Sequence, residues 1–311
     1  MSGPLGAAAE RRSFPLVPRR RQSGLPFGDR AGRRPGHGTD VIGLRPYEPG
    51  DPVASIDWYA TARLSNAHAD LEFVVRERAV DVAPRVVLVL DRRPAMALYP
   101  STFPWLSKRD AQVEVAIVIA FSAAAARAEI ALLDVADGSV AWLPPGRRDR
   151  PWLVAERATD APFRAPEDGL LQALEFLAQR RTELPAGTFL FVLSDFLVGP
   201  GDDAWIEAVG HGWDVVPVVI QDPIWERSWP HVAGVAVPVA DPDGRTLGLV
   251  RLGRRRVAGL RDRHEERYAT TIAALESVGL RPVEIGTSDP RAIEDAFLDW
   301  AEERRRGQWR R

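Results

Sequence analysis

The sequence contains no cysteine, and Lys108 is its only lysine. Without cysteine, the chain cannot form disulfides, zinc–thiolate sites or iron–sulfur clusters, and it has no thiol nucleophile. Long apolar runs are also missing: the longest, 113–126, is interrupted by Glu114 and Ser122 and is shorter than the roughly 20 residues of a membrane-spanning helix. We therefore expect a cytoplasmic protein without a membrane span.

Several signatures of catalysis are missing as well. The chain has no Gly-x-x-x-x-Gly-Lys-Ser/Thr loop, which excludes a P-loop ATPase, and no Gly-x-Ser-x-Gly elbow of an α/β-hydrolase. Its five histidines lack the spacing of a zinc site. The absence of these motifs favours a protein that is not an enzyme and that needs no cofactor.

The net charge of −2 hides an uneven distribution of charged residues. Residues 1–34 carry eight arginines against two acidic residues, and residues 304–311 carry five arginines and no acid, so the stretch between them is acidic. A nearly neutral total argues against a nucleic-acid-binding protein. Arginine-rich ends are usually solvated, and the alternative is peripheral contact with an anionic membrane surface or an acidic partner.

Composition divides the 311 residues into three segments. Residues 1–35 are rich in Arg, Pro and Gly and predict a disordered arm. Residues 36–83 contain short apolar runs between turn residues, which predicts a small β-rich extension. Residues 84–311 alternate strand and helix patterns, which predicts an α/β domain with an inserted hairpin near 233–252.

The pattern of the third segment predicts a doubly wound, mostly parallel sheet, because buried strands alternate with amphipathic helices. The expected strands are 85–90, 129–135, 139–143, 188–193, 214–220 and 282–285, and the expected helices are 107–127, 168–181, 202–209, 261–278 and 290–305.

Two of the expected strands end in a carboxylate, at Asp91 and Asp195. Functional groups concentrate at the carboxyl ends of the strands in such sheets, and a buried carboxylate is costly unless it is paired or binds a ligand. Either these residues cap loops, or they belong to a functional site. A metal-dependent or Asp-based hydrolase at these strand ends is the enzymatic alternative.

The segment before the α/β domain carries a specific motif. It reads as Arg-x-Tyr-x-x-Gly-Asp, then Ile-Asp-Trp, then Ala-Arg, and its characteristic residues are Arg45, Tyr47, Gly50, Asp51, Asp57, Trp58 and Arg63. Together with Asp91 and the later Ser194-Asp195 pair, this motif strongly resembles the signature of the bacterial DUF58 family.

The resemblance implies a von Willebrand factor A-like domain and a non-enzymatic adaptor that works with a MoxR-type AAA+ ATPase. It implies no settled biochemical activity. In A domains a metal is held by Asp-x-Ser-x-Ser, a Thr and a second Asp. Here Asp91 and Asp195 are kept, but Arg93 and Ala95 replace the serines and Asp168 stands in the Thr loop. The resemblance therefore implies a degenerate metal site without a metal.

Two structural expectations follow from these residues. Because a guanidinium is a permanent cation suited to carboxylates, we hypothesise that Arg93, or alternatively Arg92, lies between Asp91 and Asp195 in place of the metal. The alternative is that both arginines point into solvent and the aspartates only cap loops.

Within the motif, we expect Trp58 to be buried and Asp57 and Arg63 to be hydrogen-bonded. We also expect Arg45, Asp51 and Asp57 to form a buried polar network that joins the small extension to the α/β domain, with a functional surface as the alternative.

Overall fold

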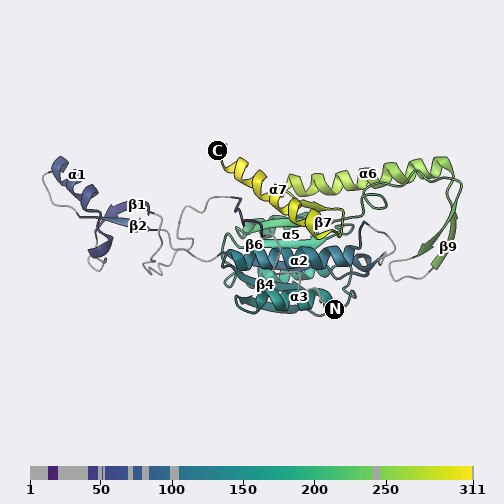
Figure 1. Cartoon of the computed structure of the whole chain (residues 1–311), viewed down its shortest axis with the longest axis horizontal. Helices are drawn as coiled ribbons and strands as arrows, with labels where there is room; N and C mark the ends of the chain where they lie inside the picture. The colour runs from purple at the N-terminus through teal and green to yellow at the C-terminus, as the bar shows by residue number, and fades with distance from the viewer. Residues whose placement is uncertain are drawn as a thin grey trace. The chain divides into compact units, whose positions relative to one another are not determined.

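The computed structural model describes residues 13–19, 41–47, 51, 53–68, 73–78, 84–98, 105–240 and 246–309 (Figure 1). The chain divides into two compact units. The larger, which we call the body, comprises Met1–Arg19 and Pro84–Arg311, and the smaller, which we call the insert, comprises Arg20–Ala83.

A six-stranded sheet forms the centre of the body (Figure 1). Its strand order is β10-β7-β6-β3-β4-β5, and every neighbouring pair is parallel except β4 and β5. The strands are β3 (Arg85–Leu90), β4 (Glu129–Asp134), β5 (Ala141–Gly146), β6 (Phe189–Ser194), β7 (Asp214–Ile220) and β10 (Val283–Ile285). This confirms the predicted α/β fold with a mostly parallel sheet.

Helices cover both faces of the sheet because its central strands are apolar on both sides. In β3, Val86 and Leu88 point into one apolar cluster, and Val87 and Val89 point into the other. The first cluster includes residues of α2 (Lys108–Ala125), α3 (Arg150–Asp160) and α7 (Pro290–Trp309), and the second includes residues of α4 (Gly169–Ala178), α5 (Asp202–Gly210) and α6 (Arg254–Ser277). The sequence patterns had not indicated α3.

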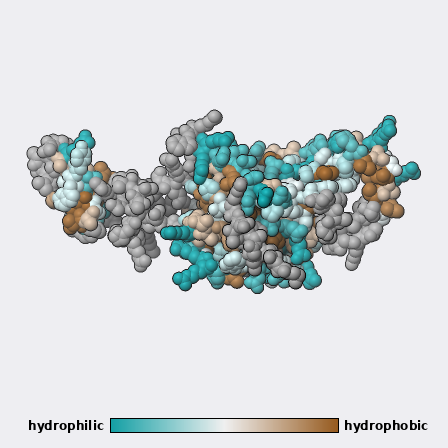
Figure 2. Space-filling model, in the orientation of Figure 1, coloured by the Kyte–Doolittle hydropathy of each residue, from teal (hydrophilic) through white to brown (hydrophobic). Residues whose placement is uncertain are grey.

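The predicted hairpin consists of the antiparallel strands β8 (Ala236–Ala240) and β9 (Thr246–Arg251). It leads into α6, which begins at Arg254 rather than near residue 261. Leu249 on β9 is 74% exposed, and Figure 2 shows apolar surface at the hairpin beside hydrophilic side chains of α6. Among the described residues, no helix combines the length and apolarity needed to cross a membrane.

Residues 13–19 form a strap on the body, which corrects the prediction that 1–35 is a disordered arm. Phe14 and Val17 are buried in the first apolar cluster. The Phe14 ring stacks on Phe297 of α7 at 4.7 Å between centroids, and its amide donates to Ser122 Oγ. The local composition did not show this, because the strap is ordered by residues far along the chain.

Polar contacts fix the end of the strap. The amide of Arg19 donates to Asp214 Oδ2 at 2.7 Å, and Arg304 of α7 donates to the same carboxylate and to the carbonyl of Val17. Arg304 therefore does not belong to a solvated basic end: its side chain is only 11% exposed.

The insert contains a helix as well as strands. Strands β1 (Val41–Pro46) and β2 (Val74–Arg78) pair antiparallel, and the helix α1 (Trp58–His68) lies between them in the sequence, after a short 3-10 helix at Val53–Ser55. The prediction of a purely β-rich segment was therefore incomplete. Asp57 begins α1, because its Oδ1 accepts the amides of Tyr59 and Ala60.

The burial predicted for Trp58 is wrong. This side chain is 61% exposed and meets only the edge of Phe73, at 6.0 Å between ring centroids, among the ring contacts of the described residues. It lies in the first turn of α1, which is joined to β2 instead by buried Thr61, whose Oγ1 accepts the Val74 amide. The neighbouring aromatic, Tyr59, is exposed too.

The other described motif residues make contacts within the insert. Arg45 and Asp51 form a bidentate ion pair, with nitrogen–oxygen distances of 2.7 and 2.6 Å. The Arg63 guanidinium lies 5.8 Å from the centroid of the Tyr59 ring, and the described residues show no hydrogen bond for it, contrary to the prediction. Tyr47 meets Phe73 edge-on, and Gly50 lies outside the described residues.

Candidate functional site

Four adjacent parallel strands end at an acidic residue on one edge of the sheet. In spatial order, Asp134 ends β4, Asp91 follows β3, Asp195 follows β6 and Asp222 lies just beyond β7. All four are buried. The sequence indicated only Asp91 and Asp195. Because buried charges are stable only when paired, the partners of these carboxylates determine what the edge can do.

Arg93 contacts both predicted aspartates. Its Nε lies 3.0 Å from each oxygen of Asp91, and its Nη2 lies 2.5 Å from Asp91 Oδ2 and 3.1 Å from Asp195 Oδ1. The expected contact between Arg93 and the two carboxylates is therefore present. Only 5% of the Arg93 side chain is exposed, so this cation is part of the interior.

Lys108 supplies a second buried cation, which the sequence interpretation missed. Its Nζ lies 2.9 Å from Asp195 Oδ2 and 2.6 Å from Glu226 Oε1. Lys108 is the first residue of α2, directly after the cap Ser107. A cation at a helix N-terminus is unfavourable without carboxylates nearby, so this position and the rarity of lysine were the available signals. We call Asp91, Arg93, Lys108, Asp195 and Glu226 the charged cluster.

The charges of this cluster stabilise one another. Burial alone would raise the pKa of Asp195, but Lys108 and Arg93 outweigh burial and hold that pKa below its usual value. Burial would likewise lower the pKa of Lys108, yet Asp195 and Glu226 raise it. For Glu226, burial outweighs Lys108 and the pKa is raised. Asp195 and Lys108 are therefore ionised over the physiological range.

Neutral side chains hold the strand ends in place around these charges. Ser194 Oγ donates to Asp91 Oδ2 at 2.6 Å and accepts the amide of Phe196. Gln112 of α2 donates to the carbonyl of Asp91, and Gln221 donates to the carbonyl of Asp195. Each strand end is thus joined to at least one other element, which makes the cluster a rigid junction.

Arg92 points away from the charged cluster. Its Nη2 donates to the carbonyls of Arg157 and Ala158 near the end of α3, and its Nε lies 3.9 Å from Asp134 Oδ2. Burial lowers the pKa of Arg92 to about 10, with Asp134 opposing the shift. Arg93, rather than the alternative Arg92, therefore lies between the two aspartates.

The other two predicted positions bring no ligand to the cluster. Ala95 lies in a 3-10 helix at Pro94–Ala97 and offers no side-chain oxygen. Asp168 is exposed, and its carboxylate accepts Gln172 Nε2 of α4. The charge of its neighbour Glu167 does reach Arg93, where it helps to raise the pKa.

These residues do not fit a divalent cation. Magnesium needs several oxygen ligands in near-octahedral geometry, whereas the carboxylates here face nitrogen cations. In the described parts of the chain, no group of three or more His, Cys, Asp or Glu side chains is arranged to hold a metal ion. The carboxylates of the cluster are instead paired with Arg93 and Lys108.

The lowered pKa of Asp195 predicts how stability depends on pH. Its stabilisation is present above the unfolded-state pKa of about 3.9 and is lost as the pH falls through the lower folded-state value. Glu226 has a raised pKa and so contributes with the opposite sign. We expect the free energy of unfolding to fall less steeply below pH 4 in Asp195→Asn than in the wild type. Urea denaturation at a series of pH values below and above 4 measures the free energy of unfolding, with the exposed Glu303→Gln as control. If this free energy falls equally steeply with pH in Asp195→Asn and in the wild type, the lowered pKa of Asp195 is contradicted.

Comparisons with known proteins come from sequence and from structure. Uncharacterized proteins of Mycobacterium bovis (Mb1516) and Mycobacterium tuberculosis (Rv1480) are each 28% identical over 222 residues, which is 70% of this chain and 65% of each relative. The chain therefore spans slightly less than two thirds of the length of these relatives.

Solved structures give weaker similarities. BatB of Bacteroides thetaiotaomicron matches 70% of this chain and 99% of its own at 14% identity and a TM-score of 0.38. The pilus adhesin SpaC of Lactobacillus rhamnosus GG matches 72% of this chain and 30% of its own at 12% identity and a TM-score of 0.42. Scores this low carry no argument about function.

The family model described as "Protein of unknown function DUF58" matches residues 43–273. The match begins within β1 of the insert, runs through the whole charged cluster and ends within α6. It therefore includes the motif residues of the insert and both aspartates at the strand ends. The chain belongs to the DUF58 family.

Proposed function

We propose that this chain is a non-enzymatic protein-interaction module with a von Willebrand factor A-like body, and that its partner is a MoxR-type AAA+ ATPase. The observation that carries the proposal is the position of Arg93 and Lys108 among three carboxylates. This arrangement compensates charge internally, at the sheet edge where a complete A domain binds its metal. A degenerate metal site is therefore our interpretation of the charged cluster.

The hydrolase alternative receives less support from the same contacts. A general base or nucleophile needs a carboxylate that can approach a substrate or a water molecule. Asp91 is held by Arg93 and Ser194, and Asp195 is held by Arg93 and Lys108. Both carboxylates are buried, so neither is presented to a substrate.

The partner is inferred from the family resemblance rather than from a contact. The test is co-purification of the tagged full chain with the MoxR-type ATPase of the same host, under mild conditions. We expect the two proteins to elute together and the chain alone to show no ATP turnover. Loss of the complex in every buffer would remove the adaptor proposal, and robust turnover by the chain alone would replace it with an enzyme.

Titration calorimetry with magnesium and manganese tests the proposal that the charged cluster binds no metal ion. We expect no saturable heat for the wild type or for Arg93→Ser with Ala95→Ser, because Lys108 still neutralises Asp195 in that variant and Asp168 lies outside the cluster. Saturable binding by the wild type that disappears in Asp91→Ala would show that the cluster holds a metal.

A further inference from the structure

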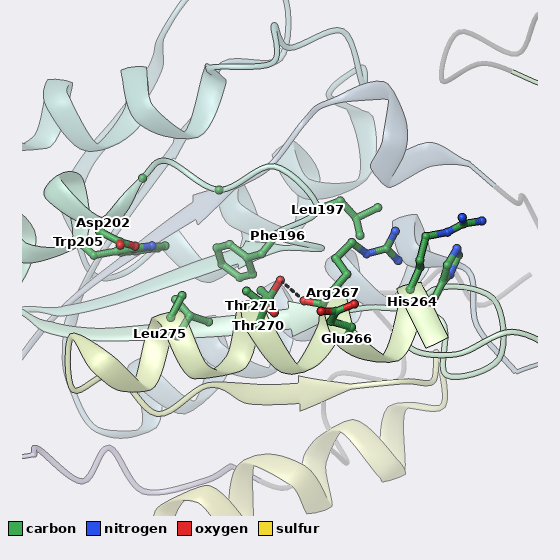
Figure 3. A pocket seen from close by; sticks show the side chains of 14 residues that line it. Phe196, Leu197, Asp202, Trp205, His264, Glu266, Arg267, Thr270, Thr271 and Leu275 are labelled. Carbon is green, nitrogen blue, oxygen red and sulfur yellow. Dashed lines mark hydrogen bonds between the residues drawn. The ribbon is translucent and has the colours of Figure 1, made fainter. Parts of the chain in front are cut away.

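A groove of about 770 Å³ lies between α6 and the loop that joins β6 to α5 (Figure 3). Its floor is apolar and includes Phe196, Trp205 and Leu275, which are all buried. Val198, between two residues that line the groove, is 46% exposed. A large side chain from another molecule would therefore gain apolar contacts here.

One end of the groove is positively charged. Arg263, His264 and Arg267 line it from successive turns of α6, and Figure 3 shows His264 and Arg267 at the same end. No carboxylate of the described residues lies within ion-pair distance of either arginine; Arg267 donates only to the carbonyl of Glu226. Burial lowers the pKa of His264, and the charges of Arg267 and Arg263 lower it further.

The other end of the α6 wall leaves space for a bound chain. Towards the C-terminus of α6 the lining residues become small, at Thr270, Thr271 and Ala274. Small side chains on one face of a helix allow a second chain to approach closely. Only Val257 and Leu275 of this long helix are buried, and Tyr268 and Ile272 pack partly buried against the second apolar cluster. Many other α6 side chains are exposed.

We propose that this groove docks a segment of a protein partner in which an acidic residue lies close to a large apolar residue. The carboxylate would face Arg263 and Arg267, and the apolar side chain would lie over Phe196 between α6 and the loop. This inference rests on the proposed role of the chain as an interaction module and names the chemistry of the surface that it uses.

A single carboxylate fits the groove better than a polyanion does. Glu266 and Asp202 also line it, so a run of phosphates along its length would meet two negative charges. Figure 3 shows Glu266 beside Arg267 and Asp202 at the other end, beside Trp205. An acidic residue at the positive end, followed by an uncharged apolar side chain, avoids Asp202 and meets only one of the two negative charges. Nucleic acid is therefore disfavoured as the occupant.

The groove is built on the charged cluster. Its floor residue Phe196 has a positive φ of 50°, a conformation that costs energy for a non-glycine residue. The amide of Phe196 donates to Ser194 Oγ, and the amide of Leu197 donates to Asp195 Oδ1. Asp195 in turn is held by Arg93 and Lys108, so the buried ion pairs position the floor of the groove.

The test begins with a phage library of random dodecapeptides, selected on the full chain. We expect enriched peptides to share an acidic residue near Phe, Leu or Trp. One such peptide is then titrated against variants. Thr270→Trp, which fills the groove, and Arg263→Glu with Arg267→Glu should each weaken binding about tenfold or more. Ala269→Trp and Arg255→Glu, exposed on α6 outside the groove, are matched controls and should bind as the wild type does.

Three outcomes would contradict the proposal that the groove docks such a segment. The first is that the enriched peptides lack acidic residues. The second is that the peptide binds Thr270→Trp as tightly as the wild type when the two proteins have the same melting temperature. The third is that a single-stranded oligonucleotide binds more tightly than the peptide. This test can fail independently of the proposed ATPase partnership. If the ATPase complex survives in Thr270→Trp, the groove is not the docking site, but the ATPase remains the partner. If the groove binds the peptide and no ATPase complex forms, the groove is supported and the ATPase is not the partner.

Discussion

Replacing Lys108 with methionine is expected to lower the free energy of unfolding by about 3–5 kcal/mol, the range for breaking a buried ion pair. The Lys108 ammonium is 2% exposed and serves both Asp195 and Glu226. Methionine fills similar space but removes the cation paired with Glu226 and leaves Asp91 and Asp195 to share Arg93. Urea denaturation of the full chain measures the change.

A second substitution distinguishes charge from shape. Adding Glu226→Gln to Lys108→Met restores the charge of the cluster, so the double variant should recover part of the loss. Arg109→Met, at the exposed neighbouring position, is the control and should change stability little. A double variant that is no more stable than Lys108→Met would show that the contact geometry of Lys108, rather than its charge, matters.

Phe14→Ala should cost about 3–5 kcal/mol, the usual loss for a buried aromatic side chain. The ring is 2% exposed and contacts three aromatic rings of the body: Phe191, Phe297 and Trp300. Its removal leaves a cavity between the strap, α7 and the sheet. Denaturation monitored by tryptophan fluorescence measures the loss, since Trp300 lines that cavity.

Leu16→Ala is the matched control for the strap, because Leu16 is only partly buried against the same cluster. It should cost clearly less than Phe14→Ala. Equal effects of the two substitutions, or no effect of Phe14→Ala, would mean that the strap contributes little to the stability of the body.

The sheet and part of the site could be predicted because they depend on local patterns. Apolar runs such as 189–193 form buried strands, and parallel strands bring Asp91 and Asp195 to one edge. The position of Arg93, two residues after Asp91, was predictable for the same reason. Its position after β3 brings the side chain within reach of both carboxylates, which then hold it.

The other cluster residues depend on tertiary structure. Lys108 reaches Asp195 because α2 begins beside the strand ends, and Glu226 lies in a loop 118 residues later in the sequence. No spacing rule connects such positions. For Trp58 the sequence interpretation predicted a contact that is absent. Its burial was inferred from residue type, but among the described aromatic rings only Phe73 contacts it.

The strap also determines how the body would bear a mechanical load. The chain leaves the body at Arg19, bound to Asp214, and returns at Pro84 before β3. Asp214 pairs with Phe189, which pairs with Val86, so the two attachment points lie two strand spacings, or about 10 Å, apart.

Tension applied to the insert would therefore act on two unequal anchors. The anchor at β3 is a central strand with hydrogen-bond ladders on both sides, whereas the anchor at the strap is one short segment held by side chains. The strap would yield first and uncover the aromatic side chains Phe297 and Trp300. Pulling on the insert would in this way expose apolar surface on the body while its sheet stays intact.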